Sequence, residues 1–313
     1  MSVVSNWPEL SWPAWRKTAL HLQLMTQVVG KIRLALTPWL NHSWHVTLTV
    51  TARGLTTGPI AVNGEMLEIA FDFLDEQLVF TSSAGSISIL PLAAGSLADF
   101  HAGAMETLAD LGIDVVIDPM PSEIADAIAF PQDMQVRPYD AGAVRAFWRA
   151  LVQADRVFRQ FRTGFLGKAS PVHFFWGSFD LAVTRFSGHG APRHPGGVPG
   201  LPDAVTREAY SHEECSAGFW PGSDAFPQAA FYAYAYPAPE GFADAAVEPA
   251  AAAFDAKLGE FLLPYEAVRV AADPDGALLA FLQSTYNAAA NLAGWDRAAL
   301  ECALGAPRVP RPA

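Results

Sequence analysis

Three strand-like segments separated by tight-turn signals constrain the fold of this 313-residue chain more than any other feature of the sequence. The segments are MLEIAFDF (66–73), QLVFTS (77–82) and SISIL (86–90). Breaks short enough for hairpin turns precede or separate them, at Asn63-Gly64, Asp75-Glu76 and Ala84-Gly85. Consecutive strands joined by such turns cannot be parallel. We therefore predict an antiparallel meander in the first half of the chain.

The segment SWHVTLTVTARG (43–54) has the clearest strand pattern of the chain. Apolar Trp44, Val46 and Leu48 alternate with polar His45 and Thr47. This period of two is typical of a strand with one buried face. We expect a second, shorter strand at IDVVID (113–118).

Apolar residues at helical spacing predict helices at 12–36, 96–112, 140–165 and 274–293. Residues suited to the N-cap position precede three of them, namely Ser11, Ser96 and Asp273. In the second half we expect strands within 172–188, 207–222, 230–237 and 259–265. Residues 188–203 form a long loop rich in Gly and Pro, a kind of segment that is often functional.

These elements predict an α+β fold with two antiparallel-sheet halves covered by long helices. The expected parts are an N-terminal half (1–120), a linker (121–139), a C-terminal half with the candidate site (140–300) and a flexible tail (301–313). We expect the halves to pack as one unit. WHVTLTVTAR aligned on WGSFDLAVTR indicates a weak internal duplication, although the inside and outside patterns of the two segments disagree.

Charge and cysteine usage narrow the classes of partner. The net charge of −12 repels phosphate backbones and anionic membranes, so we expect neither nucleic acid nor a membrane as partner. No apolar run approaches the ~20 residues of a membrane span, and the N-terminus lacks a signal-peptide pattern. Cys215 and Cys302 lie far apart and form no metal-binding knuckle, which favours a reduced, cytoplasmic setting. The oligomeric state is not predicted.

Ionisable residues within REAYSHEECSAGFWPG (207–222) are the main candidates for chemistry. On a strand, His212 and Glu214 share one face and Glu213 takes the other. His173 from another strand is the expected third member of the group. We assign all four as candidate catalytic residues, and His173, His212 and Glu214 as candidate ligands of a divalent transition metal, since zinc and non-haem iron use these residue types. The alternative is a structural histidine hydrogen-bonded to a carboxylate.

Further residues of the second half are candidates for substrate binding. Arg185 suits an anionic group of a substrate. The alternating tyrosines of FYAYAYP (231–237) suit the wall of a ligand cavity, or equally an exposed strand face. His194 lies in the Gly/Pro loop, which would serve as a lid. The full set of candidates is Trp176, Asp180, Arg185, His194, Tyr232 and Tyr234.

Literal runs along most of the chain resemble a known bacterial family. They include VGKIRLAL, NHSWHVTLTVTARGLTT, FWRALVQADRVF, GKASPVHFFWGSFDLAVTRFSG, REAYSHEECSAGFWPG and FYAYAYP. Together they resemble the family catalogued as domain of unknown function 5996, from about Trp7 to Trp295. The resemblance implies a soluble bacterial protein and supplies no activity, cofactor or catalytic residue.

Our leading hypothesis from the sequence is a small-molecule enzyme with a His/carboxylate site in the C-terminal half. Two alternatives are open. The first is a small-molecule-binding protein without chemistry, in which aromatic residues make a pocket. The second is a structural or partner-binding protein, which would show an exposed apolar patch rather than a deep cavity.

Overall fold

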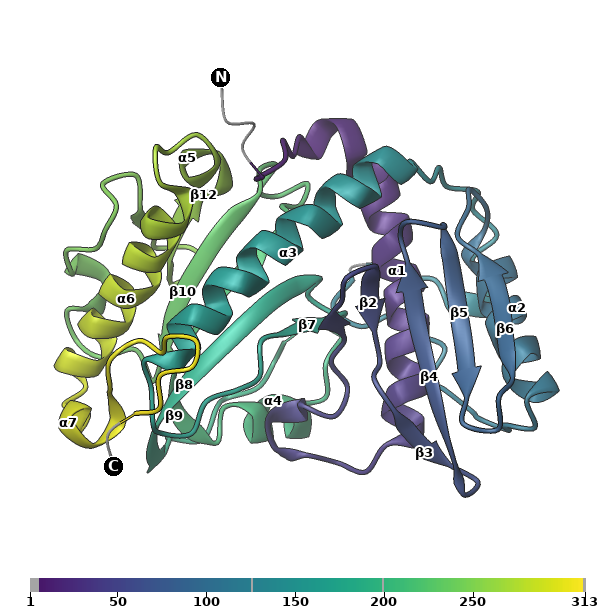
Figure 1. The fold of residues 1–313 in the computed structure, drawn as a ribbon, viewed down its shortest axis with the longest axis horizontal. Helices are drawn as coiled ribbons and strands as arrows, with labels where there is room; N and C mark the ends of the chain where they lie inside the picture. The colour runs from purple at the N-terminus through teal and green to yellow at the C-terminus, as the bar shows by residue number, and fades with distance from the viewer. Residues whose placement is uncertain (1–5, 125, 199, 312–313) are drawn as a thin grey trace.

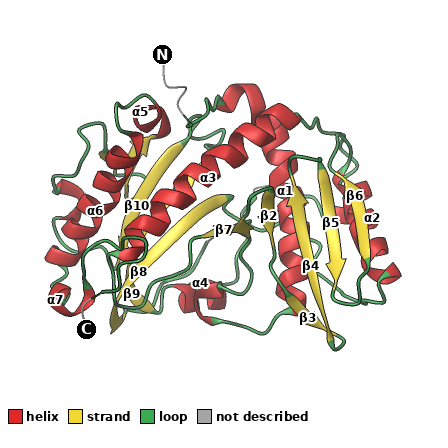
Figure 2. Cartoon of the chain, in the orientation of Figure 1, coloured by secondary structure: helices red, strands yellow, loops and turns green. Residues whose placement is uncertain are grey.

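The structure is a computed structural model and describes residues 6–124, 126–198 and 200–311 (Figure 1). It contains two antiparallel sheets of six strands each together with covering helices (Figure 2), so the predicted α+β class is confirmed. In this view helix α1 (Trp12–Leu36) runs behind β2 and β4 of the first sheet, and α3 (Ala141–Thr163) crosses the second sheet.

The first sheet confirms the predicted meander. Its strands are β1 (Thr49–Val50), β2 (Gly54–Thr56), β3 (Ile60–Val62), β4 (Glu65–Asp72), β5 (Gln77–Ser82) and β6 (Ile87–Pro91). They lie in the order β1-β2-β4-β5-β6, and β3 pairs with β4. The turn between β3 and β4 uses Asn63 and Gly64 at positive φ (52° and 81°), as a tight hairpin turn requires.

The prediction of one long strand over 43–54 is wrong. Residues Asn41–Ser43 form a 3₁₀ turn, and His42 and Ser43 both have φ of 56°. Strand pairing is limited to β1, to β2 and to a bridge between Leu48 and Phe174 of the second sheet. Tertiary contacts override the local pattern here, because residues 41–48 fold across the second sheet. The strand expected at 113–118 is also wrong, since those residues have irregular structure.

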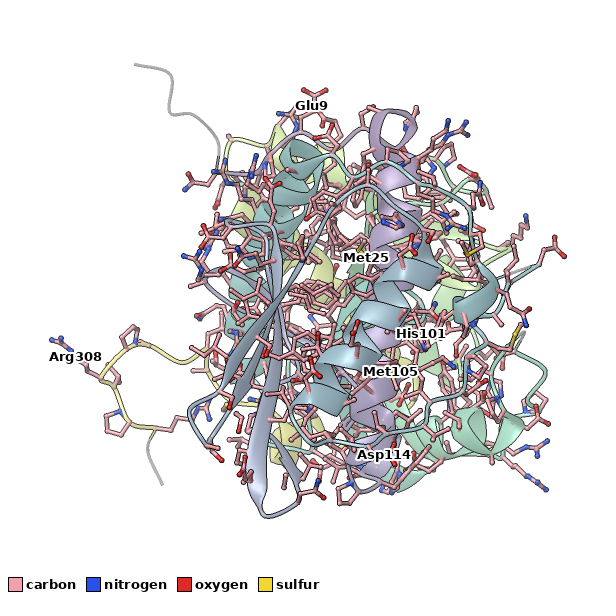
Figure 3. The ribbon with its side chains drawn as sticks, turned by 90° about the vertical axis from the view of Figure 1, so that its right-hand side faces the viewer. Glu9, Met25, His101, Met105, Asp114 and Arg308 are labelled. Carbon is pink, nitrogen blue, oxygen red and sulfur yellow. The ribbon has the colours of Figure 1, made fainter. Side chains whose placement is uncertain are left out.

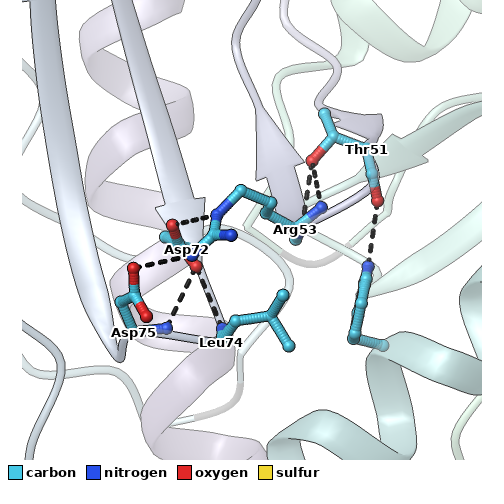
Figure 4. A network of polar contacts seen from close by, with 7 residues as sticks. Thr51, Arg53, Asp72, Leu74 and Asp75 are labelled. Atoms are coloured by element: carbon cyan, nitrogen blue, oxygen red, sulfur yellow. Dashed lines mark hydrogen bonds and ion pairs between the residues drawn. The ribbon is translucent and has the colours of Figure 1, made fainter.

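Helices cover the inner side of the first sheet. Helix α2 (Leu97–Asp110) is capped by Ser96, whose hydroxyl accepts a hydrogen bond from the Asp99 amide at 3.1 Å, as the capping pattern predicts. Figure 3 shows α2, with His101 and Met105, in front of α1 and beside the strands. On the solvent side, Arg53 binds the carboxylates of Asp72 and Asp75 at 2.5 and 2.6 Å (Figure 4).

The second sheet carries the candidate residues. Its strands are β7 (His173–Phe175), β8 (Asp180–Gly190), β9 (His212–Trp220), β10 (Ala230–Tyr236), β11 (Ala253–Asp255) and β12 (Glu260–Pro264), in the order β11-β12-β10-β9-β8-β7. Helices α3 and α6 (Pro274–Leu292) pack on one face. Short helices α4 (Asp203–Ala209), α5 (Tyr265–Arg269) and α7 (Arg297–Leu300) complete the half.

One apolar core runs through both halves of the chain. The predicted linker has little regular structure, in keeping with its prolines, but it is packed along α1. The side-chain amide of Gln27 exchanges hydrogen bonds of 2.7 and 2.8 Å with the backbone of Ser122, and Phe130 is fully buried. The proposed division into halves and their internal duplication stay predictions.

Candidate active site on the second sheet

A cavity of about 590 Å³ lies on the face of the second sheet opposite α3 and α6. Its floor is formed by alternate residues of β8, β9 and β10. Its walls come from residues 39–46 of the first half, from residues 118–123 at the start of the linker, and from α4 with the loop before it. The floor residues are Asp180, Ala182, Thr184, Phe186, Glu214, Ser216, Tyr232 and Tyr234. The pocket is therefore built by both halves of the chain.

Asp180 is held at one end of the floor. It is 6% exposed and accepts hydrogen bonds from the hydroxyls of Ser178 and Tyr232. The Tyr232 ring reaches it by crossing over Gly218 of β9, where a Cβ atom would lie 2.3 Å from the ring. Burial raises the pKa of Asp180, against the effect of these two donors. The close approach explains why β9 has glycine at this position.

Glu214 lies toward the other end of the floor. Its pairing with Phe186 places it six residues along β8 from Asp180, or about 20 Å along the strands. The residue is 6% exposed, and its carboxyl group is hydrogen-bonded to the Tyr234 hydroxyl, which lies 3.2 Å from that of Tyr210. Burial raises the pKa of Glu214 to about 8, although Tyr234 and the nearby Lys168 charge oppose the shift.

Three further carboxyl residues line the cavity, namely Asp118, Glu123 and Glu260, and the sequence analysis missed all of them. Asp118 binds Lys31 at 3.0 Å. Glu260 begins β12, and burial together with Asp180 and Asp255 raises its pKa to about 7. Glu123 is an exposed residue, but its carboxyl oxygen packs against Gly177. Lost hydration and the charge of Asp180 raise the pKa of Glu123 to about 7. Neither Glu123 nor Glu260 lies in a pattern that reveals its side-chain direction, because Glu123 follows irregular backbone and Glu260 follows a turn.

A lysine and a histidine meet beside the Glu214 end. The Nδ1 of His42 lies 2.7 Å from the Ala209 carbonyl, so it must carry the proton, and Nε2 then accepts from the Lys168 ammonium at 2.5 Å. Burial lowers the pKa of both His42 and Lys168. The ammonium also lies 4.7 Å from the ring centre of Phe186 and 5.6 Å from that of Trp44.

His173 on β7 is a neutral polar group in the wall. It is 2% exposed, and its Nδ1 has no hydrogen-bond partner among the described residues. Burial, together with the charge of Arg33, lowers the pKa of His173 to about 3. The imidazole packs against Phe175 and Trp44, at ring-centre distances of 4.7 and 6.4 Å. It therefore offers the cavity an uncharged ring.

Aromatic side chains make most of the remaining wall. Trp176 is fixed by a 2.7 Å hydrogen bond from its Nε1 to the Val46 carbonyl. Its ring lies where α1 has Gly30, at which a Cβ would come within 2.2 Å of the indole. The other aromatic lining residues are Trp39, Trp44, Phe175, Phe186, Tyr210, Trp220, Tyr232 and Tyr234.

Six of the predicted site residues line this cavity. They are His173, Trp176, Asp180, Glu214, Tyr232 and Tyr234. Tyr232 and Tyr234 of β10 thus face this cavity, which was one of the two alternatives left by the tyrosine alternation, whereas Tyr236 is not part of its lining. His194 lies outside the cavity lining and stacks on Tyr210 at 4.8 Å, with its Nδ1 accepting from the Gly196 amide.

Three predicted site residues lie elsewhere. His212 packs against His42, 5.5 Å between ring centres, and is not part of the cavity lining. Glu213 accepts a hydrogen bond from Ser187 at 2.8 Å on the opposite side of the strand. Arg185 was expected to meet an anionic group, but it is 1% exposed on the helix face, with its guanidinium 3.5 Å from the ring centre of Phe161.

The predicted metal ligands are not brought together. Within residues 6–124, 126–198 and 200–311, no group of three or more His, Cys, Asp or Glu side chains is placed to hold a metal ion. The register explains this, because a β-bulge between Phe186 and Gly190 offsets His212 from Glu214 along β8. His173 packs against Trp44, at 6.4 Å between ring centres, whereas His212 packs against His42.

The comparisons with known proteins add a family and no activity. None of the helices in the described part of the chain is long and apolar enough to span a membrane. No curated protein and no solved structure matches the chain. The model of a family of unknown function, DUF5996, matches residues 7–302, in agreement with the resemblance seen in the sequence. The chain belongs to this family of unknown function.

Proposed function

We propose that the protein binds a small organic molecule in the cavity on the second sheet. The observation that carries this proposal is the carboxyl group of Glu214, which is 6% exposed and lines a cavity of about 590 Å³ with aromatic walls. Small-molecule sites have this combination of volume, apolar lining and a few convergent polar groups.

The energetics of the site support a ligand over a structural role. Burying a carboxyl group costs free energy, which an apolar side chain at the same position would not cost. A cavity also forgoes the packing contacts that stabilise a core. Asp180 and Glu214 combine both costs on one face of one sheet, and stability alone gives no reason to keep them.

Equilibrium dialysis tests this proposal. The protein is dialysed against a defined mixture of small molecules, and retained compounds are identified by mass spectrometry. Ala182→Phe places a ring in the cavity floor and should abolish retention, because the floor residue Ala182 lies between Asp180 and Thr184. Ala70→Phe is the matched control, at a central position of the first sheet outside this cavity. Equal retention by both variants, or none by the wild type, would contradict the proposal.

Catalysis by proton transfer is a second candidate, and one observation favours it. Glu214 has a pKa of about 8 and is hydrogen-bonded to Tyr234, so it exchanges protons near neutral pH, which is where a general acid or base works best. Once a retained compound is known, its conversion is followed by mass spectrometry. Glu214→Gln should then reduce turnover far more than it reduces retention. Equal losses of turnover and retention would contradict a catalytic role of Glu214 and support binding without catalysis.

A further inference from the structure

The charged groups of the cavity are strongly unbalanced. Carboxyl groups from five residues line it, namely Asp118, Glu123, Asp180, Glu214 and Glu260. Lys31 is the one Lys or Arg among the described lining residues, and its ammonium is already bound to Asp118 at 3.0 Å. The other four carboxyl groups form no ion pair with a described Lys, Arg or His side chain.

The walls of the cavity present aromatic faces, which attract cations. The protein itself provides an example, because the ammonium of Lys168 lies over the rings of Phe186 and Trp44 at 4.7 and 5.6 Å. Both rings also line the cavity. An ammonium group arriving from solvent would therefore meet the same kind of surface, backed by carboxyl groups.

A third observation does not depend on the acidic residues. The Nδ1 of His173 is buried in the cavity wall without a hydrogen-bond partner in the described structure. The imidazole is kept neutral, since burial lowers its pKa to about 3, so it does not repel a cation. A neutral ring nitrogen either donates to or accepts from a polar group of a ligand.

We infer that the ligand of this cavity is an organic amine, bound through its ammonium group by Glu214 and the aromatic walls. This inference rests on the proposed binding function and names its ligand class. An anionic ligand would gain no ion pair with an arginine, because none lines the cavity among the described residues, and it would oppose ionisation of any carboxyl group beside it.

The protonation states add a signature for this ligand class. Burial raises the pKa of Glu214 to about 8, so most of its carboxyl is protonated at neutral pH in the free protein. An ammonium group beside it favours the carboxylate, so binding of an amine must release protons at neutral pH. Binding of a neutral compound has no such requirement.

Dialysis against matched compounds tests the inference. The mixture contains amines, each with an alcohol and a carboxylate of the same carbon skeleton, such as phenethylamine, phenethyl alcohol and phenylacetate. We expect the full-length protein to retain amines at least about tenfold better than their partners, the factor that one charge-assisted hydrogen bond provides. Calorimetry in buffers of different ionisation enthalpy should then report proton release.

Variants make the result specific to the site. Glu214→Gln keeps the size of the side chain and should weaken amine retention about tenfold. Glu213→Gln makes the same chemical change one residue earlier, outside the lining of this cavity, and should leave amine retention unchanged. Tyr234→Phe, which removes one hydroxyl beside Glu214, provides a second variant if Glu214→Gln does not fold.

The outcomes separate the inference from the proposed function. Preferred retention of alcohols or carboxylates, lost in Ala182→Phe, would overturn the amine inference and leave the binding function standing. Retention of no compound of any class would overturn both. Retention of amines that Glu214→Gln and Glu213→Gln reduce equally would also overturn the inference, because the effect would then be one of net charge.

Discussion

The two sheets have the same number of strands and are both antiparallel, yet one has an exposed face and the other has both faces covered. The first sheet leaves Ile87 and Ile89 of β6 more than half exposed. On the second sheet the face away from α3 and α6 is covered by other segments. Acidic residues are buried on it, with Asp180 and Glu214 each 6% exposed. The difference indicates that the first sheet serves as a scaffold and that the second holds the site.

Charges on the two sheets show the same contrast. Arg53 on the first sheet is half exposed and pairs with the exposed Asp75 and the largely covered Asp72 (Figure 4), so its charge stays in contact with solvent. The carboxyl groups on the second sheet are desolvated, and the segment that covers them, residues 39–46, comes from the first half. Building the site thus requires both halves.

The largest expected effect concerns Glu214 and pH. Its pKa rises from 4.5 to about 8 on folding, so the folded protein holds a proton that the unfolded chain loses first. The free energy of unfolding should therefore fall as pH rises from 4.5 to 8, and Glu214→Gln should remove on the order of 5 kcal/mol of that fall. Urea denaturation of both proteins at several pH values measures this difference.

Glu213→Gln is the control for this experiment, and Tyr210, Tyr234 and Lys168, which face Glu214, are unchanged in both variants. If the free energy of unfolding had the same pH dependence in the wild type and in Glu214→Gln, this carboxyl group would titrate normally. The contrast between solvated charges on the first sheet and desolvated ones on the second would then be lost.

Gly218→Val should have the next largest effect. Its side chain would collide with the Tyr232 ring, which lies 2.3 Å from the Cβ position, and would displace Tyr232 from Asp180. Overpacking of this kind costs about 1–3 kcal/mol. Chemical denaturation measures the loss of stability, and dialysis should show lost ligand retention. Unchanged stability would mean that Tyr232 does not cross this strand.

Arg185→Met tests the helix face of the same sheet. Arg185 stacks on Phe161 and Tyr286, and its Nε and Nη1 have no partner among the described residues. An apolar side chain of similar size should change the free energy of unfolding by less than about 2 kcal/mol, because lost stacking is offset by the removed buried charge. Ligand retention should stay at the wild-type level. Selective loss of retention would mean that Arg185 acts on the cavity.

Ile89→Thr on the first sheet should have the smallest effect. Ile89 is 53% exposed, and exposed positions of this kind change the free energy of unfolding by at most about 0.5 kcal/mol. Thermal and urea denaturation should superimpose on the wild type. A loss of several times this size would show that another surface covers the first sheet.

Local sequence patterns predicted those elements whose caps and apolar periodicity lie within one continuous segment. Helix α1 occupies the expected residues 12–36, and the cap at Asp273 and the tyrosine alternation of β10 are also present. Segment 43–54 shows the limit of such patterns. Its alternation is real, but contacts with Trp176 and Phe174, distant in sequence, decide its backbone.

The candidate site was predicted in part for the same reason. Strand alternation separated Glu214 from Glu213 on one strand, and it placed Tyr232 and Tyr234 on one face of another. Arg185 was misassigned because alternation gives the two faces of a strand without saying which one meets the helices. Glu123 and Glu260 join the site through irregular backbone and a strand end, which no period describes.

A crystal structure of the protein with a retained compound tests the central claim most directly. We predict that the compound lies on the cavity face of the second sheet, in contact with Tyr234 and within hydrogen-bond distance of Glu214. A saturating compound bound elsewhere, for example in the groove beside Trp148 and Arg149, would contradict the account.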